Sequence, residues 1–205
     1  MKTRIIVPLV IVMGVFFGVQ VSIAAPIEEL TKQCSDCHKK DGNSADGETP
    51  HIAGMSPGYF KESMAAYQSG ARPAKVVKRP NKPDTDMKAI VEKLNAKDIE
   101  ALAAFYSKQK YQPHVQNTDA NKAKAGEKLH QQYCDKCHEN AGRSGEDDAG
   151  ILAGQPLNYL RYSFESYAKG QRKTGEKMEK KFKIMQEKAG MEGIEQLIHF
   201  YASQK

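Results

Sequence analysis

The sequence predicts an all-α protein built from two similar domains in tandem. The first observation is an internal repeat, in which residues 52–72 match residues 152–172 in the same order, one hundred positions apart. The second observation is that apolar residues recur at helical spacing in both copies, without the alternation typical of strands. A period of this length is too long for a solenoid unit, so the repeat indicates a duplicated domain.

The repeat also includes a pentapeptide that carries chemistry. Residues 34–38 (CSDCH) recur as residues 134–138 (CDKCH), and the two copies use all 4 cysteines of the chain. In a CxxCH segment the two thiols can reach the two vinyl groups on one edge of a porphyrin, and the histidine can bind the iron beneath the ring. The sequence therefore predicts two haem c groups, attached at Cys34, Cys37, Cys134 and Cys137, with His38 and His138 as axial iron ligands.

Other uses of two CxxC pairs explain the sequence less well. A four-cysteine zinc site, two thioredoxin-like redox centres and structural disulfides all leave the histidine after each pair without a role. A zinc site also staples a small fold, whereas these two pairs lie one hundred residues apart. We therefore expect haem attachment at both pairs.

The amino terminus predicts export from the cytoplasm. Lys2 and Arg4 precede an apolar run over residues 5–19, and small residues follow the run. This order is typical of a secretory signal peptide. An uncleaved membrane anchor is the alternative, but the run is shorter than the ~20 residues that span a bilayer. We expect residues 1–24 to be removed and the mature chain to be periplasmic, without a membrane span.

Length and charge limit the remaining possibilities. Without the signal peptide the chain has about 180 residues, enough for two compact domains of about 90 residues each. The polar segment 109–121 contains Pro113 and lacks apolar periodicity, so we expect a linker there, between domains 25–108 and 122–205. The formal net charge is +6, but the sequence has no long basic run with interleaved aromatic residues. This argues against nucleic-acid binding.

The expected first domain contains three or four helices. A short helix over residues 27–33 precedes the first CxxCH segment. The second helix begins at Pro57, because proline is favourable in a first turn, and ends near Gly70. A short helical run comes next. The last helix begins at Asn95, which forms a capping pair with Asp98.

The expected second domain repeats this order. A helix over residues 123–133 precedes the second CxxCH segment, and another runs from Pro156 to near Gly170. The terminal helix, residues 194–201, corresponds to residues 99–106 at an offset of ninety-five. The second domain has therefore lost five residues before its terminal helix.

The sixth iron ligand decides what each haem does, because a closed His/Met site favours electron transfer and an open site permits catalysis. Met87 and Met178 follow flexible basic loops, whereas a methionine within a helix usually packs in a core. We expect Met87 and Met178 to be the axial ligands. The alternatives are Met55 for the first haem and Met185 for the second, and the weaker candidates are His51, His114, His130 and His199.

The motifs that surround the two CxxCH segments resemble those of the cytochrome c4 family. Residues 34–44 and 52–54 carry the resemblance in the first half, and residues 152–155 and 159–160 carry it in the second. The family consists of dihaem periplasmic electron carriers made of two class I cytochrome c domains. The resemblance therefore implies that fold and that activity. It also places Met87 and Met178 at the axial methionine positions.

Within this family, three segments look most like the cytochrome subunit of flavocytochrome c sulfide dehydrogenase. They are residues 110–113, 133–139 and 200–204. That resemblance implies an FAD-containing flavoprotein partner, which oxidises sulfide and passes electrons to the haems. Two departures from free cytochromes c4 are Met55, which replaces a common glutamine, and the pair Lys39-Lys40, which replaces a small residue.

Three functions follow from these expectations. The first is an electron-transfer subunit, not an enzyme by itself, that receives electrons from the flavoprotein and passes them to a soluble cytochrome or an oxidase. The second is a free-standing cytochrome c4 that delivers electrons to a terminal oxidase. The third is a dihaem enzyme, such as a peroxidase or a thiosulfate dehydrogenase, which needs a haem without the methionine ligand.

Overall fold

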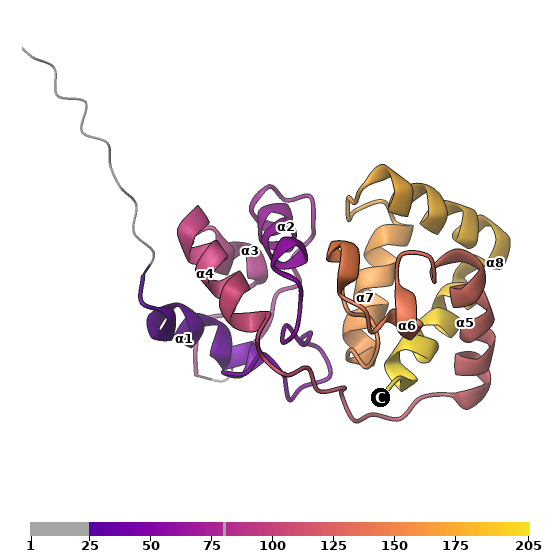
Figure 1. The fold of residues 1–205 in the computed structure, drawn as a ribbon, viewed down its shortest axis with the longest axis horizontal. Helices are drawn as coiled ribbons and strands as arrows, with labels where there is room; N and C mark the ends of the chain where they lie inside the picture. Colours follow the sequence, from indigo (N-terminus) through magenta and orange to yellow (C-terminus); the bar gives the residue numbers. More distant parts are fainter. Residues whose placement is uncertain (1–24, 80) are drawn as a thin grey trace, which may run out of the picture.

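A computed structural model describes residues 25–79 and 81–205 (Figure 1). The predicted signal peptide, residues 1–24, lies outside the described residues. The first half of the described chain folds into four helices, α1 (Ile27–His38), α2 (Pro57–Gln68), α3 (Met87–Val91) and α4 (Ala96–Tyr106). No helix within the described ranges is long and apolar enough to cross a membrane.

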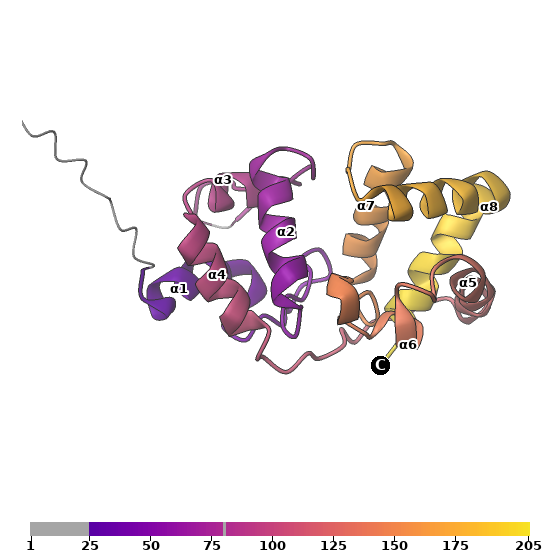
Figure 2. The same ribbon diagram turned by 45° about the horizontal axis from the view of Figure 1, so that its top comes forward.

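The second half forms the other domain, beside the first in both views (Figures 1 and 2). Its elements are α5 (Ala120–Tyr133), α6 (Glu139–Gly142), the 3-10 turn η1 (Glu146–Asp148), α7 (Leu157–Ala168) and α8 (Glu176–Ser203). The predicted all-α class is confirmed. Apart from one isolated bridge between Val77 and Thr85, the described part of the chain contains no strand.

Side-chain caps set where the helices begin. The Ser56 hydroxyl accepts a hydrogen bond from the Tyr59 amide at the start of α2. Asn95 and Asp98 form the predicted capping box at the start of α4. At α5 the carboxylate of Asp119 accepts hydrogen bonds from two backbone amides of the first turn, so this helix begins three residues before the predicted residue 123.

The two halves differ at the CxxCH segments. Helix α1 continues through the whole first segment to His38, beyond the predicted end at residue 33. In the second half the helix ends at Tyr133, and the segment itself forms turns. The last two helices predicted for the second domain form one element, α8, which is interrupted at Gly190, where φ is 64° and ψ is −164°. Glycine adopts this backbone conformation without the steric cost that a Cβ imposes.

The repeat is visible in the backbone hydrogen bonds. The Gly42 carbonyl accepts from the amides of Ile52 and Ala53, and the Gly142 carbonyl accepts from the equivalent amides one hundred residues later. Gly42 has φ of 79°, and a Cβ there would lie 2.8 Å from the Ala53 nitrogen. The loop after each CxxCH segment is therefore fixed to the chain that precedes α2 or α7.

Each domain has its own hydrophobic core. In the N-terminal domain Phe60 and Tyr106 stack with ring centroids 5.9 Å apart, at the crossing of α2 and α4. In the C-terminal domain Phe164 and Tyr201 are 6.2 Å apart, at the crossing of α7 and α8. Both aromatic pairs belong to buried clusters, so each domain can pack as a separate unit.

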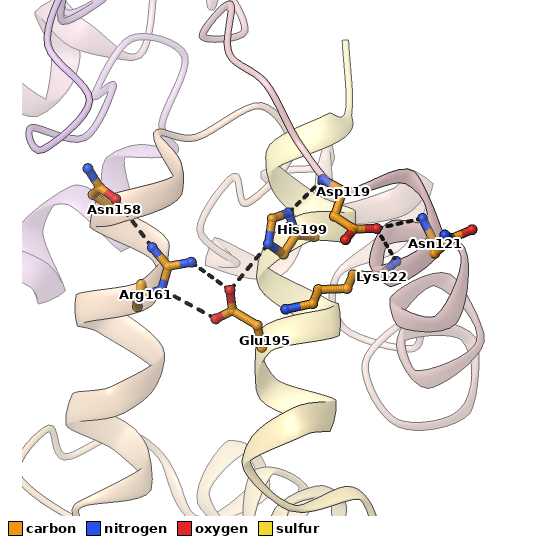
Figure 3. A network of polar contacts seen from close by, with 7 residues as sticks. All are labelled: Asp119, Asn121, Lys122, Asn158, Arg161, Glu195 and His199. Carbon is orange, nitrogen blue, oxygen red and sulfur yellow. Dashed lines mark hydrogen bonds and ion pairs between the residues drawn. The ribbon is translucent and has the colours of Figure 1, made fainter.

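A polar network fastens α5 and α7 to α8 (Figure 3). Arg161 on α7 donates to both carboxylate oxygens of Glu195 on α8, at 2.6 and 3.3 Å. His199 lies one turn later, and its Nε2 is 3.2 Å from the same carboxylate. His199 Nδ1 accepts from the Asp119 amide, which ties the start of α5 to the network. The hydrogen bonds from Arg161 help to hold the pKa of Glu195 below its usual value.

The two domains meet through α2, α7 and the loops beside them, which face each other in both views (Figures 1 and 2). Arg72 donates to the hydroxyl of Tyr159 at 2.9 Å, and the Lys173 amide donates to the Ala71 carbonyl at 2.7 Å. The segment between α4 and α5 adds a third contact, because the Tyr111 hydroxyl donates to the Ala153 carbonyl at 2.7 Å. The interface is therefore rich in polar contacts.

Candidate functional site

The first CxxCH segment opens into a cavity of about 350 Å³ in the N-terminal domain. Cys34, Cys37 and His38 line this cavity at the carboxyl end of α1. Apolar side chains of α2, α3 and α4 form much of its wall, and Met87 at the start of α3 contributes to it. One cavity thus contains the predicted attachment cysteines and both predicted axial residues of the first haem.

His38 is held in one orientation. Its side chain is 5% exposed, and Nδ1 lies 2.8 Å from the carbonyl oxygen of Pro50. Burial lowers the pKa of His38, so the ring is neutral at physiological pH. A neutral ring that donates Nδ1–H to Pro50 keeps Nε2 unprotonated and free to bind a metal.

The second CxxCH segment lines a larger cavity of about 1200 Å³. Cys134, Cys137 and His138 are again on its wall, together with Met178 in the first turn of α8. Burial, followed by the charge of His130, lowers the pKa of His138 to about 4, against a hydrogen bond to the Gly150 backbone that raises it. His138 Nδ1 is a buried atom, although the ring as a whole is half-buried.

Each cavity is lined by two methionines. Met87 and Met178 are half-buried and lie at the exits of loops, as the sequence predicts. Met64 and Met185 are 6% and 1% exposed and lie within helices, where they pack in the two cores. Met55 is not among the described residues that line either cavity.

The other histidines have partners of their own. His51 is buried, with Nδ1 3.3 Å from Asn43 and Nε2 3.4 Å from His114. His130 is buried between the Tyr201 hydroxyl at 2.9 Å and the Asp135 carboxylate at 3.0 Å. Together with His199, these histidines take part in local polar contacts, and none of the four lines either of the two cavities described above.

The sequence leaves the role of Arg72 open, between a solvated basic face and a surface that neutralises haem propionates, and it does not indicate that Arg172 is buried with Arg72. Arg72 lies in a basic cluster of the kind that usually covers a solvated face, yet it is only 7% exposed. The two guanidinium groups lie over the rings of Tyr67 and Tyr167, at 4.5 and 4.6 Å. Both arginines line both cavities. Their matching positions in the repeat were the available signal.

The arginines create a positive potential at the interface. Burial by itself raises the pKa of Tyr59, but the charges of Arg72 and Arg172 and hydrogen bonds at its hydroxyl lower it to about 8. Within residues 25–79 and 81–205, neither arginine forms an ion pair with a carboxylate. A buried cation without a carboxylate is costly unless another anion lies nearby.

These features fit haem c. The walls are largely apolar, and each cavity has one cysteine pair and one neutral histidine, which is buried in the first cavity and half-buried in the second. Both cavities are also lined by two guanidinium groups that have no carboxylate partner among the described residues. Haem propionates are anions that the arginines can neutralise. None of the four cysteines is paired in a disulfide within the described residues, so every thiol is available for a thioether bond.

The alternative uses of the cysteines fit less well. The two pairs line different cavities, and the described ranges contain no cluster of three or more potential metal-binding His, Cys, Asp or Glu side chains. Burial raises the pKa of Cys34, and it raises that of Cys134 to about 11. A thioredoxin-like centre needs a thiol with a lowered pKa, so these environments disfavour redox thiols.

Comparisons with known proteins agree with this chemistry. The family model described as cytochrome c matches residues 24–110. The cytochrome c4 of Stutzerimonas stutzeri is 30% identical over 149 residues, which cover 68% of this chain and 69% of that protein. The cytochrome c4 of Azotobacter vinelandii is 27% identical over 148 residues, with the same 68% and 69% shares.

Solved structures share the arrangement of the helices. The crystal structure of reduced recombinant cytochrome c4 from Pseudomonas stutzeri has a TM-score of 0.68 and 25% identity, covering 89% of this chain and 100% of that chain. The thiosulfate dehydrogenase TsdBA from Marichromatium purpuratum also has a TM-score of 0.68, covering 88% of this chain and 40% of that chain. At 22% identity that second likeness shows the fold alone. The chain belongs to the cytochrome c4 family and is a dihaem electron-transfer cytochrome.

Proposed function

We propose that this protein is a free-standing periplasmic carrier that delivers electrons to a terminal oxidase. In this proposal residues 1–24 are a cleaved signal peptide, residues 25–108 and 122–205 are the two haem domains, and residues 109–121 link them. The protein carries electrons and makes or breaks no bond of a substrate.

The proposal assigns the axial positions to His38 and Met87 in the first domain, and to His138 and Met178 in the second. The observation that carries this assignment is that each His/Met pair lines the same cavity as one cysteine pair. Both histidines are neutral at physiological pH because desolvation lowers their pKa, which leaves a ring nitrogen available for iron. The two methionines are at loop exits, where an unbranched thioether side chain can reach a ligand.

A closed His/Met environment suits electron transfer. A thioether sulfur is a soft ligand that favours ferrous iron and raises the reduction potential, and a filled sixth position excludes peroxide or another substrate. The apolar walls keep water away from the haem, so the chain does not need to reorganise when the charge on the iron changes. The protein's contribution is to position each haem and to set the electrostatic environment around it.

The choice of partner rests on the relatives. They are cytochromes c4, and they support a free-standing carrier better than the cytochrome subunit of flavocytochrome c sulfide dehydrogenase. The subunit remains the second candidate because Met55, a buried residue, replaces the glutamine common in free carriers. An FAD-containing flavoprotein would be the partner in that case.

Native purification tests the two candidates. A free carrier elutes with two haems per chain and no flavin, and it is oxidised by membranes that contain a terminal oxidase. A sulfide dehydrogenase subunit elutes with one FAD for every two haems, and sulfide reduces its haems. Stable co-elution with a flavoprotein, combined with sulfide-dependent reduction, would reject the free carrier.

A further inference from the structure

A chain of polar side chains connects the second CxxCH segment to the crossing of α5 and α8. His130 on α5 is 3% exposed, and its Nε2 lies 3.0 Å from a carboxylate oxygen of Asp135, whose side chain is 55% exposed. His130 Nδ1 lies 2.9 Å from the hydroxyl of Tyr201 on α8. Tyr201 lines the second cavity together with Cys134. The chain therefore runs from a carboxylate in solvent to the wall of the cavity that contains an attachment cysteine.

The last contact in this chain is between Tyr201 and Cys134. Burial raises the pKa of the Cys134 thiol to about 11, and a hydrogen bond with the Tyr201 hydroxyl acts in the opposite direction. Both side chains belong to the packed cluster of the C-terminal domain, where Tyr201 is buried and Cys134 is partly buried. The thiol is thus kept protonated by its surroundings but lies next to a hydroxyl that can exchange a proton with it.

The positions of the protons follow from what each group can donate or accept. An ionised carboxylate only accepts, so His130 Nε2 carries a proton and donates it to Asp135. Burial lowers the pKa of His130, although Asp135 raises it, so the ring is neutral at physiological pH. Nδ1 is then the unprotonated nitrogen and accepts from the Tyr201 hydroxyl. A lone pair of the tyrosine oxygen remains available to accept from the thiol.

The first repeat has the tyrosine and the cysteine but lacks the groups behind them. Tyr106 forms the equivalent hydrogen bond with Cys34. Leu30 stands at the position of His130, and Ser35 stands at the position of Asp135. Leu30 is 3% exposed in the core that also contains Tyr106, so an apolar side chain fills this helix crossing. Packing alone therefore does not require a histidine at residue 130.

We propose that Tyr201, His130 and Asp135 form a proton relay that helps Cys134 to bond to a haem vinyl group. The relay acts once, when the haem is attached, and has no part in electron transfer. This inference rests on the proposed attachment of a haem at Cys134 and Cys137, and not on the identity of the electron-transfer partner.

The reaction adds the thiol across the carbon–carbon double bond of the vinyl group. The S–H bond breaks, a C–S bond forms at the carbon next to the ring, and a proton is added to the outer carbon. Nothing is oxidised or reduced. The thiolate is the nucleophile, and the burial of Cys134 makes it scarce at neutral pH. A base that accepts the thiol proton while the C–S bond forms would remove this obstacle.

The relay can supply that base through two short proton transfers. The Cys134 thiol gives its proton to the Tyr201 oxygen while the Tyr201 hydroxyl gives its own to His130 Nδ1. Asp135 stabilises the imidazolium, as the carboxylate does in other activated nucleophiles. The new Tyr201 O–H then donates to the thiolate. His130 returns its proton to solvent, which also provides the proton for the outer vinyl carbon, so the reaction is balanced.

The test follows thioether formation in the full chain of 205 residues, produced in a bacterium that attaches haem c. Chains collected at short times after induction are denatured, treated with iodoacetamide and digested. Mass spectrometry of the peptides that contain residues 34–38 and 134–138 then shows which cysteines carry a thioether and which were alkylated. The first segment of each chain is the internal reference for the second.

Tyr201→Phe removes only the hydroxyl, and His130→Leu introduces the residue that the first repeat already has. We expect both variants to slow thioether formation at Cys134 about a hundredfold, the lower end of the range for a positioned general base, without a change at Cys34. Asp135→Asn should slow it less. Because Asp135 is exposed, this variant remains informative if the two buried variants do not fold.

Tyr106→Phe is the matched control, because the equivalent hydroxyl of the first repeat has no histidine behind it. Thioether formation at Cys34 should stay as in the wild type. Raising the pH of the medium from 7 to 8 increases the thiolate fraction about tenfold, so the deficit of Tyr201→Phe and His130→Leu at Cys134 should shrink. A network that only fastens α5 to α8 would lower stability without this dependence on pH.

Two results would overturn the relay. One is equal thioether formation at Cys134 in the wild type and in Tyr201→Phe. The other is a loss at Cys34 in Tyr106→Phe as large as the loss at Cys134 in Tyr201→Phe. A wild-type chain with no haem on residues 134–138 would instead remove the attachment site on which the relay rests.

Discussion

Arg72 Nη2 donates a hydrogen bond to the hydroxyl of Tyr159 across the domain interface, at 2.9 Å. The same guanidinium lies over the ring of Tyr67 in its own domain, 4.5 Å from the centroid. One buried cation thus contacts both domains and lines both haem cavities. Because a positive charge favours the reduced, less positive state of a haem, this contact links the assembly of the interface to the redox potentials.

The first prediction concerns this charge. Arg72→Gln removes a buried positive charge and keeps a side chain that can donate a hydrogen bond to Tyr159. Both reduction potentials should fall, by the equivalent of about 1 kcal/mol for one charge at the effective dielectric constant of a protein. Redox titration of the holoprotein measures the change.

Lys93→Gln is the control for net charge. Lys93 is exposed and is not among the residues that line a cavity. Solvent and salt screen its charge, so both potentials should stay within the error of the measurement. Equal shifts of the reduction potentials in the two variants would mean that the potentials respond to the total charge of the protein and not to the position of Arg72.

The second prediction concerns pH and His51. Burial, followed by the neighbouring His114, lowers the pKa of His51 to about 4. The unfolded chain binds a proton at this residue near pH 6.5 and the folded chain does not, so stability is lost as the pH falls from about 7 toward 4. The loss should reach about 2 kcal/mol at pH 5.

Denaturant unfolding at pH 7 and pH 5 checks this expectation. His51→Gln keeps the backbone groups that Gln155 binds but has no titratable ring. The variant should lose about 2 kcal/mol less stability than the wild type between the two pH values. If both proteins lose the same amount, His51 is not the group responsible.

The sequence predicted the parts of the fold that depend on local patterns. The CxxCH segments and the capping box at Asn95 each need only a few neighbouring residues, and the helices predicted from apolar spacing are present. The ends of α1 and α8 were wrong by several residues. Apolar spacing does not indicate that α1 continues through the cysteines to His38, or that a break at Gly190 leaves α8 as one element.

The interface could not be predicted in the same way. The contact between the Gln155 side chain and the His51 backbone joins residues 104 positions apart, and the segment that contains Gln155 does not indicate this partner. Arg72 resembled a surface residue because its neighbours in the sequence are lysines. Only the position of α2 opposite α7 buries its guanidinium, and a linear pattern does not contain that information. The signal in the sequence was that an arginine recurs at the equivalent position 172 of the second repeat. An arginine that only faces solvent need not occur in both copies of a duplicated domain.

The third prediction separates the two candidate ligands of the second haem. Met178→Ala should lower the potential of the C-terminal haem, because the soft thioether is lost, and should leave the haem attached at Cys134 and Cys137. Met185 is 1% exposed in the core, so Met185→Ala should cost about 2–5 kcal/mol of stability and leave the ligation intact.

The charge-transfer band that marks thioether sulfur on ferric haem iron provides the measurement. With two haems, Met178→Ala should lose about half of its intensity if one of two sites opens. Met87→Ala should lose the other half and lower the potential of the N-terminal haem. A full band in Met178→Ala, with half of the band lost in Met185→Ala, would reverse the assignment.

The fourth prediction concerns the crossing of α5 and α8, where Gly126 allows the two helices to approach closely. A Cβ at residue 126 would lie 2.1 Å from the carbonyl oxygen of Gln196 and 2.8 Å from Phe200 Cβ. Neither neighbour is the flexible end of a side chain, so Gly126→Ala must move one helix. The overpacking should cost about 2 kcal/mol, more than the ~1 kcal/mol that alanine adds to helix propensity.

Gly145→Ala is the matched control for this change. Gly145 has φ of −98°, and an added Cβ there would meet nothing closer than 3.9 Å. Its effect on stability should be within about 0.5 kcal/mol. Thermal unfolding of the two holoproteins should therefore show a clear fall in Tm for Gly126→Ala alone. Equal Tm values would show that α5 and α8 can separate at no cost, and that the contact between Gly126 and Gln196 does not fix the position of the second CxxCH segment at the end of α5.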